Sequence, residues 1–531
     1  MTLNVHIDRH VGDAIASSPT ISRRQLLREF LARRASGDYP LSDHTTAPAS
    51  DESRIVPDPS APRRVITHDE AMALAEFVRE VTEGKFTGVA IAHAVTAVAT
   101  QRVGNAPRSG DADELELRWP TRLGNMVNVG ISTNVRDPDT LRRVIHRAAA
   151  TKAPPMTGPL AEEDPDLADA PRPATYMPVS LWYPSTSTAM TTERGTALAQ
   201  LTAPFHGTAW HGVGTVAMSA KAFLYLSPDG STTAWGDATD AEVSMTARAA
   251  DGSAAGWSGR AHRDWRQLHP ADVAQAAIAA AEQQRNPSRA EPGRYTAILS
   301  ATAVGQLLHA MAGSFNVARQ SPFNLPTTKE VGQKDRRGER LFDPRVTLSS
   351  DPTDPDGGDW PFFYGDGGMG EPNPKSIWVE HGVLKLRSVD VGTGLQYGMI
   401  PRKDPLAMRM NGGPTSVAEM IANCERGIYV HRFANLEVID GLSGAMSGYT
   451  RDGCLFIQNG KIVRPVKDFR IFESPFLSLN RVLALGTPER IAFGFTPPNP
   501  YRREQHWPLP PVIAPPLMVS DFNFAALADN V

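Results

Sequence analysis

The sequence has few cysteines, a small net charge and no long apolar run, and each of these features excludes a class of protein. Its two cysteines, Cys424 and Cys454, form no CxxC pattern, which excludes a disulfide framework or a thiolate zinc site. The formal net charge of −4 lacks the basic surplus of nucleic-acid-binding proteins. No run reaches the ~20 apolar residues of a membrane span. We therefore expect a folded cytoplasmic protein with neither nucleic acid nor membrane as a partner.

The N-terminal region predicts a helix followed by a linker. The stretch SRRQLLREFLARR (22–34) begins like a twin-arginine export signal, but the apolar segment of such a signal is missing. Its leucines and phenylalanine recur at helical spacing, which indicates an amphipathic helix with a charged outer face. Residues 36–65 are rich in Ser, Pro and Asp, as is typical of a linker. We assign 1–65 to an N-terminal helix and flexible linker.

The chain is long enough for at least two hydrophobic cores, and residues 66–290 predict the first domain. A helix begins after the capping residue Thr67, and two β-like stretches follow it. Asp137 and Pro138 predict the start of another helix. The stretch AFLYLSPDGSTTAWG (222–236) indicates a β-hairpin, and a helix from residue 269 closes this half.

Residues 291–531 predict a second domain that is rich in strands. It opens with the strand RYTAILS (294–300), and Asn459-Gly460 between two apolar runs is a strong hairpin signal. The stretch PTSVAEMIANCERGIYV (414–430) predicts a capped helix followed by a strand. A short final strand is expected after the proline-rich tail. The predicted fold class is therefore α+β, with an N-terminal sheet-and-helix domain and a C-terminal β-rich domain.

Three C-terminal stretches resemble one protein family in residue order and spacing. They are RGIYVHRF (426–433), SGYTRDGCLFIQNGKIVRPVKDFRIFESP (447–475) and PPLMVSDFNF (515–524). They resemble the TldD/PmbA family, whose members are described as modulators of DNA gyrase and include zinc metallopeptidases. The resemblance covers most of residues 290–530. It implies a two-domain α+β protein that pairs as a dimer or heterodimer around an internal chamber.

The family resemblance also implies a degenerate metal site. Active members carry HExxxH on a helix and a C-terminal cysteine, so that zinc keeps one open position for water and the glutamate takes its proton. In VGQLLHAMAGSF (304–315), His309 matches the first histidine, while Ala310 and Ser314 stand where the glutamate and second histidine belong. Alanine accepts no proton, and a serine hydroxyl is a poor zinc ligand. We expect neither metal nor catalytic residues in this chain, as in the metal-free PmbA (TldE) type.

These residues imply a subunit of a TldD/TldE-type heterodimeric zinc metallopeptidase, with zinc in a TldD-like partner subunit. The substrate would be an unstructured peptide or a small N-acyl metabolite, and a homodimer stays open. The alternative is a non-enzymatic binding or regulatory protein of the gyrase-modulator type. A third hypothesis is a lone amide hydrolase with Cys424 as its nucleophile.

His309 and Arg451 are the candidate substrate-binding residues. The resemblance places the stretch GYTRDG (448–453) beside the chamber, where Arg451 would bind a substrate carboxylate bidentately. A solvated turn charge explains Arg451 equally well, and an ordinary core histidine explains His309.

Two further patterns resemble binding sites but do not support one. His206 and His211 are five residues apart in a Gly-rich stretch with no acidic third ligand, so chance is favoured over a metal site. The stretch YGDGGMGE (364–371) predicts a flexible turn, since no strand is expected before it and no helix after it.

Overall fold

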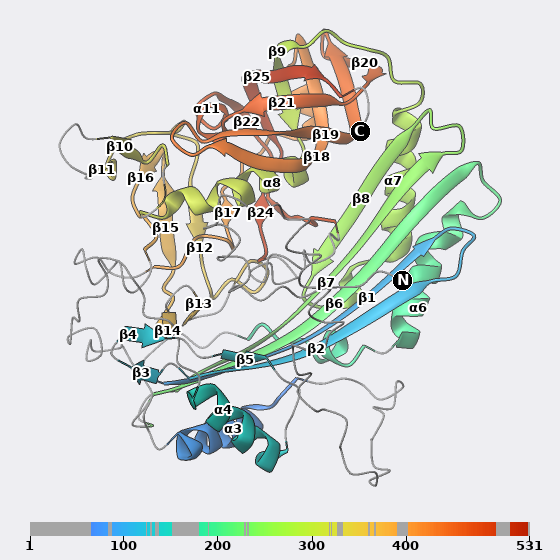
Figure 1. Ribbon diagram of the computed structural model, residues 1–531. Helices are drawn as coiled ribbons and strands as arrows, with labels where there is room; N and C mark the ends of the chain where they lie inside the picture. Colours follow the sequence, from blue (N-terminus) through green and yellow to red (C-terminus); the bar gives the residue numbers. More distant parts are fainter. Residues whose placement is uncertain are drawn as a thin grey trace, which may run out of the picture. The chain divides into compact units, whose positions relative to one another are not determined.

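The computed structural model confirms the α+β class (Figure 1). It describes residues 65–82, 88–119, 121–123, 125–127, 130–132, 137–150, 180–189, 191–227, 230, 233–317, 319, 321–326, 333–358, 362–365, 368–389, 402–494 and 510–528. The predicted helix 22–34 and almost all of the linker 36–65 lie outside these residues. Within the described ranges, no helix has the length and apolar character needed to cross a membrane.

The N-terminal half is built on one antiparallel sheet of long, curved strands (Figure 1). Its strands in spatial order are β5 (Gly130–Ser132), β2 (Arg108–Arg118), β1 (Val89–Arg102), β6 (Trp210–Leu226), β7 (Thr233–Ala249) and β8 (Ala255–His262). Buried and half-buried residues alternate along β1, as its apolar-polar pattern predicts. The predicted hairpin is confirmed, because β6 and β7 pair from Leu226–Thr233 onward.

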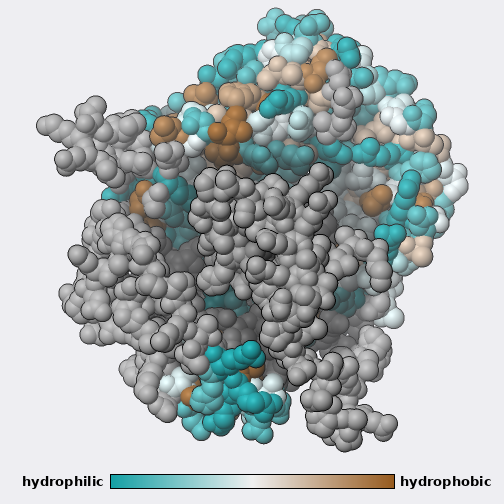
Figure 2. Space-filling view, in the orientation of Figure 1, coloured by the Kyte–Doolittle hydropathy of each residue, from teal (hydrophilic) through white to brown (hydrophobic). Residues whose placement is uncertain are grey.

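Three helices cover this sheet, and capping side chains explain where two of them begin. Helix α3 (His68–Val81) begins with a capping box between Thr67 and Glu70, and Asp137 caps α4 (Pro138–Ala150) by accepting from the Thr140 N–H at 2.8 Å. Helix α7 (Pro270–Gln283) packs on β8 at Gly256, where an added Cβ would lie 2.2 Å from the Ala281 nitrogen. All three helices were predicted. Figure 2 shows mainly hydrophilic residues in the area of α3 and α4.

Several shorter elements of this half were not predicted. They are α5 (Pro184–Ser187), α6 (Thr191–Thr202), η3 (Ala203–Phe205) and η4 (Trp265–Gln267). The small hairpin of β3 (Thr121–Leu123) and β4 (Asn125–Val127) lies within the second predicted β-like stretch, 114–133. Helix α6 carries buried leucines that join the core shared by β6, β7 and α7.

In the C-terminal half, five strands pair into a closed ring. The ring runs β18 (Arg426–Asp440), β9 (Gly293–Leu299), β25 (Leu517–Leu527), β21 (Phe469–Glu473), β19 (Ala445–Gln458) and back to β18. Only the β9–β18 pair is parallel. Strand β20 (Lys461–Val466) adds to β19, and β22 (Val482–Leu485) adds to β25.

The sequence signals for the strands of this ring are confirmed, with one difference in length. Asn459 and Gly460 have φ of 50° and 73°, the left-handed conformation that the β19–β20 hairpin requires. The predicted helix is α10 (Val417–Ala422), with a capping box at Ser416, and β18 follows it. The final strand β25 is eleven residues long rather than short.

A second sheet and a helix stand beside the ring. The sheet runs β16 (Val383–Leu384), β15 (Ser376–Glu380), β12 (Leu348–Ser350), β17 (Arg409–Met410), β24 (Ile513–Ala514) and β23 (Glu489–Arg490). Helix α8 (Ala301–Met311) continues as η5 (Ala312–Phe315), and its buried side chains share one core with both sheets. The remaining elements are α11 (Pro475–Ser478), β10 (Asn324–Pro326), β11 (Gln333–Asp335), β13 (Phe362–Gly365) and β14 (Gly368–Pro372).

The glycine-rich stretch 364–371 differs from its prediction. It lies in a β-hairpin of β13 and β14, with Gly365 paired to Gly368, where a flexible turn without a preceding strand was expected. Phe362 explains the difference, because its fully buried ring packs on Phe223 of β6 and anchors the first strand. The predicted domain boundaries at residues 65 and 290 stay predictions.

Candidate functional site

His309 lies in the last turn of helix α8, at the edge of the helix's buried face. Ser300 caps this helix by accepting from the Ala303 N–H at 3.1 Å. The Nδ1 atom of His309 is buried and has no hydrogen-bond partner in the part of the chain that the structure describes. Burial lowers the pKa of His309, so its imidazole is neutral near pH 7.

Ala310 and Ser314 supply no chemistry for a metal at this helix. Ala310 packs against the large core, and Ser314 lies in η5, where the α-helix has tightened into a 3-10 turn. Among the described residues, no three His, Cys, Asp or Glu side chains come together in a way that would hold a metal ion. The residues at this position therefore do not fit the zinc that the resemblance implies for active members.

The short segment 491–494 covers His309. The ring of Phe493 contacts that of His309 edge to face, with centroids 5.0 Å apart. Ile491 lies so close to α8 that a Cβ on Gly305 would come within 2.4 Å of its Cδ1 atom. Glycine at position 305 is therefore required for this close approach. The other side of the segment contacts strand β7, where the Phe493 N–H donates to Glu242 Oε2 at 3.1 Å.

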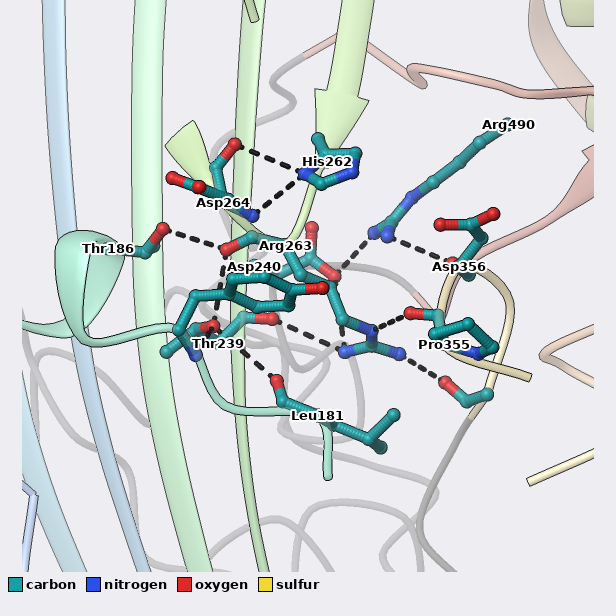
Figure 3. Close-up of polar contacts among 12 residues, drawn as sticks. Leu181, Thr186, Thr239, Asp240, His262, Arg263, Asp264, Pro355, Asp356 and Arg490 are labelled. Atoms are coloured by element: carbon teal, nitrogen blue, oxygen red, sulfur yellow. Dashed lines mark hydrogen bonds and ion pairs between the residues drawn. The ribbon is translucent and has the colours of Figure 1, made fainter. Parts of the chain in front are cut away.

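A buried ionic network fixes the start of this segment (Figure 3). Arg490 Nη2 donates to Asp240 Oδ2 at 2.5 Å, and the Arg263 guanidinium lies 3.9 Å from the same oxygen. Arg263 also donates to the carbonyls of Thr239 at 3.2 Å, of Pro355 at 3.0 Å and of Gly358. One carboxylate thus holds two guanidinium groups, and the network joins strands β7, β8 and β23 to the loop at 354–358.

Glu242 is the titratable group with the most unusual environment next to this segment. It is buried, and its Oε1 atom has no hydrogen-bond partner among the described residues. Burial raises the pKa of Glu242 to about 7, opposed by the Phe493 N–H and assisted by the charge of Asp240. The carboxyl group therefore changes charge near neutral pH. Asp240, Glu242 and Ser244 are alternate residues of β7 and all are buried, a polar stripe that sequence reasoning missed.

The arginine that reaches the covering segment is Arg432 rather than Arg451. The Arg432 guanidinium pairs with Asp452, with Nε 2.8 Å from Oδ2, and lies 4.8 Å above the Trp257 ring. Its Nη1 atom would lie 3.7 Å from a Cβ on Gly494. Arg451 is half-buried on β19, and its charge opposes the burial that raises the pKa of Asp468 to about 6. No contact between Arg451 and His309 occurs among the described residues, and the substrate-binding roles of both stay predictions.

The other candidates do not assemble into a site. Cys424 is buried, and burial raises the pKa of its thiol, which disfavours the thiolate that a nucleophile needs. His206 and His211 are exposed and belong to no metal-holding group within the described ranges.

Comparisons with known proteins agree with this fold. A family model described as "PmbA/TldA metallopeptidase C-terminal domain" matches residues 292–526. A DNA gyrase modulator by name, from Bacteroides thetaiotaomicron, aligns with a TM-score of 0.65 and 16% identity over 86% of this chain and 100% of its own. A protein of the same description from Thermotoga maritima aligns with a TM-score of 0.63 and 15% identity over 86% of this chain and 100% of its own. TldE from Thermococcus kodakarensis aligns with a TM-score of 0.64 and 15% identity over 85% of this chain and 99% of its own.

A comparison with curated protein sequences finds no match. The structural likenesses show the shared fold, and the family model covers the half that contains helix α8 and the closed ring. Residues 292–526 therefore form a C-terminal domain of the TldD/PmbA family of metallopeptidase-related proteins.

Proposed function

We propose that the chain is the metal-free subunit of a TldD/TldE-type heterodimeric zinc metallopeptidase. In this proposal a TldD-type partner supplies zinc and the general base, and the complex hydrolyses amide bonds of an unstructured peptide or a small N-acyl metabolite. The chain itself contributes substrate contacts and a wall of the reaction chamber. We also propose a cytoplasmic location, which the free thiols of Cys424 and Cys454 support.

One observation carries the proposal: His309 stands alone at the metal-helix position and is covered by Phe493. Hydrolysis by a zinc peptidase needs several metal ligands, an open coordination position and a base at the same place. Here Ala310 and Ser314 provide neither base nor imidazole, and the Phe493 ring occupies the space beside His309. A subunit with these residues needs a partner for the chemistry.

The test is to purify the chain alone, a TldD-type partner from the same genome alone, and the two together. Zinc per polypeptide is measured by plasma mass spectrometry, and cleavage with a labelled unstructured peptide. We expect zinc in the partner and the complex, cleavage by the complex, and cleavage to disappear when the glutamate of the partner's HExxxH is changed to Gln. Stoichiometric zinc and activity in the lone chain would refute the proposal. Stable binding to a target protein with no activity in any combination would favour the regulatory alternative.

A further inference from the structure

The C-terminal half contains an open cavity of about 520 Å³ that shares no residue with the surroundings of His309. It lies where α11 and the end of β21 meet the turn after β18 and the residues that follow β11. Its lining consists of Arg294, Pro322, Arg336, Arg340, Leu341, Ser443, Ala445, Phe472, Glu473, Ser474, Phe476, Leu477 and Asn480. The volume is in the range of roughly 300–1,000 Å³ that is typical of ligand-binding clefts.

Large apolar side chains are exposed at this cleft. Phe472 is 49% exposed and Leu477 is 47% exposed, and both line it. Leu442, beside the lining residue Ser443, is 47% exposed. Figure 2 shows hydrophobic residues on the surface in the area of α11 and β22. Exposed apolar groups that gather at a cleft with polar surroundings are typical of interaction sites.

The cleft also has an excess of positive charge. Arg294 shares the Asp521 carboxylate with Arg481, at 3.2 and 2.9 Å, and Arg336 pairs with Glu339. The Arg340 guanidinium is exposed and has no hydrogen bond or ion pair within the described ranges. The lining itself holds three guanidinium groups, those of Arg294, Arg336 and Arg340, and one carboxylate, that of Glu473.

The carboxylate of Glu473 is already hydrogen-bonded to the backbone beside it and to that of β25. Its oxygens accept the backbone N–H groups of Ser474 and Asn523, both at 2.9 Å. Burial raises the pKa of Glu473, opposed by these N–H groups and by the charges of Arg294 and Arg481. Arg340 is therefore left as an unpaired, permanently charged donor fork beside exposed apolar surface.

We propose that this cleft binds an acidic, apolar segment of another protein. A carboxylate of the segment would pair with Arg340, bidentately where the geometry allows, and a neighbouring Leu or Phe side chain would cover Phe472 and Leu477. Aromatic residues and arginine are the groups enriched at the centres of protein interfaces. The inference does not depend on the proposed peptidase role, because none of its residues belongs to that site.

The test uses an array of six-residue peptides that combine Glu or Asp with Leu or Phe, followed by fluorescence polarisation with the best binder. Matched peptides carry Gln and Asn in place of the acids. A second pair with free and amidated C-termini separates side-chain carboxylates from a terminal one. We expect the acidic peptide to bind at least about tenfold more tightly than its amide counterpart, and its binding to weaken as salt is added.

The matched protein variants are Arg340→Ala at the cleft and Arg248→Ala on β7, another exposed arginine that lies outside it. Arg340→Ala should weaken the acidic peptide about tenfold, Arg340→Lys should retain part of the binding, and Arg248→Ala should change nothing. Leu477→Ser reports on the apolar contact. The proposal is overturned if no acidic peptide binds, if the amide peptides bind equally well, or if Arg340→Ala and Arg248→Ala behave alike.

Discussion

The rings of His309 and Phe493 meet edge to face with centroids 5.0 Å apart, so one aromatic side chain covers the histidine at the metal-helix position. Truncation by Phe493→Ala should hydrate the imidazole and move the pKa of His309 back toward its ordinary value, because burial is what lowers it. Histidine ring resonances followed by NMR across pH 4–9 measure this. Phe472→Ala, which removes an exposed ring elsewhere, is the control. An unchanged His309 titration in Phe493→Ala would show that other groups bury the ring.

The approach of Ile491 to helix α8 predicts a steric cost at Gly305. In Gly305→Ala the new methyl group would lie 2.4 Å from Ile491 Cδ1, so the covering segment or the helix must shift. We expect a loss of roughly 1–3 kcal/mol of stability, the usual cost of overpacking a core. Gly110→Ala is the control, since nothing lies within 4 Å of an added Cβ there. Equal thermal unfolding temperatures for both variants would contradict the close packing.

Glu242 predicts a stability that falls as the pH rises through neutrality. Its pKa is raised on folding from 4.5 to about 7, so the folded state binds the proton more tightly than the unfolded chain. The tighter proton binding stabilises the fold fully below about pH 4.5, and this stabilisation is lost as the pH rises to about 7. The free energy of unfolding falls over this range by at most roughly 3 kcal/mol. Glu242→Gln, which keeps the neutral shape, should flatten this part of the profile. Urea unfolding of both proteins at pH 5, 6, 7 and 8 measures the difference; parallel profiles would remove Glu242 as the cause.

Asp240 predicts a large loss of stability when its charge is removed. Asp240→Ala leaves the buried guanidinium groups of Arg490 and Arg263 without their shared carboxylate. Breaking a buried pair in this way typically costs ~3–5 kcal/mol. Glu76→Ala, which breaks the solvent-exposed pair with Arg79, should cost under about 1 kcal/mol. Thermal unfolding compares the two variants, and a similar small effect for both would mean that water or other groups compensate the arginines.

The elements that the sequence predicts correctly are those with local causes. The Thr67 capping box starts α3 within four residues, and Asn459-Gly460 sets the β19–β20 hairpin by its own φ angles. The length of β25 was underestimated, because its partners β9 and β21 are selected by packing across the domain. The β13–β14 hairpin was missed for the same reason, since Phe362 finds its pocket on β6.

The candidate site divides in the same way. The HExxxH spacing on one helix is enough to identify three of its positions, His309, Ala310 and Ser314. Glu242 and Arg432 contact the covering segment from strands that are distant in sequence, and only the folded chain brings them there. The alternate polar residues of β7 were the one available signal, because three polar side chains on the same face of a long apolar strand need a reason.

The closed ring has a consequence for the order in which the protein is made. Strand β9 opens the C-terminal half and β25 is its last element, yet the two lie side by side and β25 also joins β21. The ribosome synthesises β25 after the other four strands of the ring. Until then β9 and β21 each present an unpaired edge to the cell, and such edges invite pairing with other chains. The ring therefore stays open to such pairing until β25 joins it.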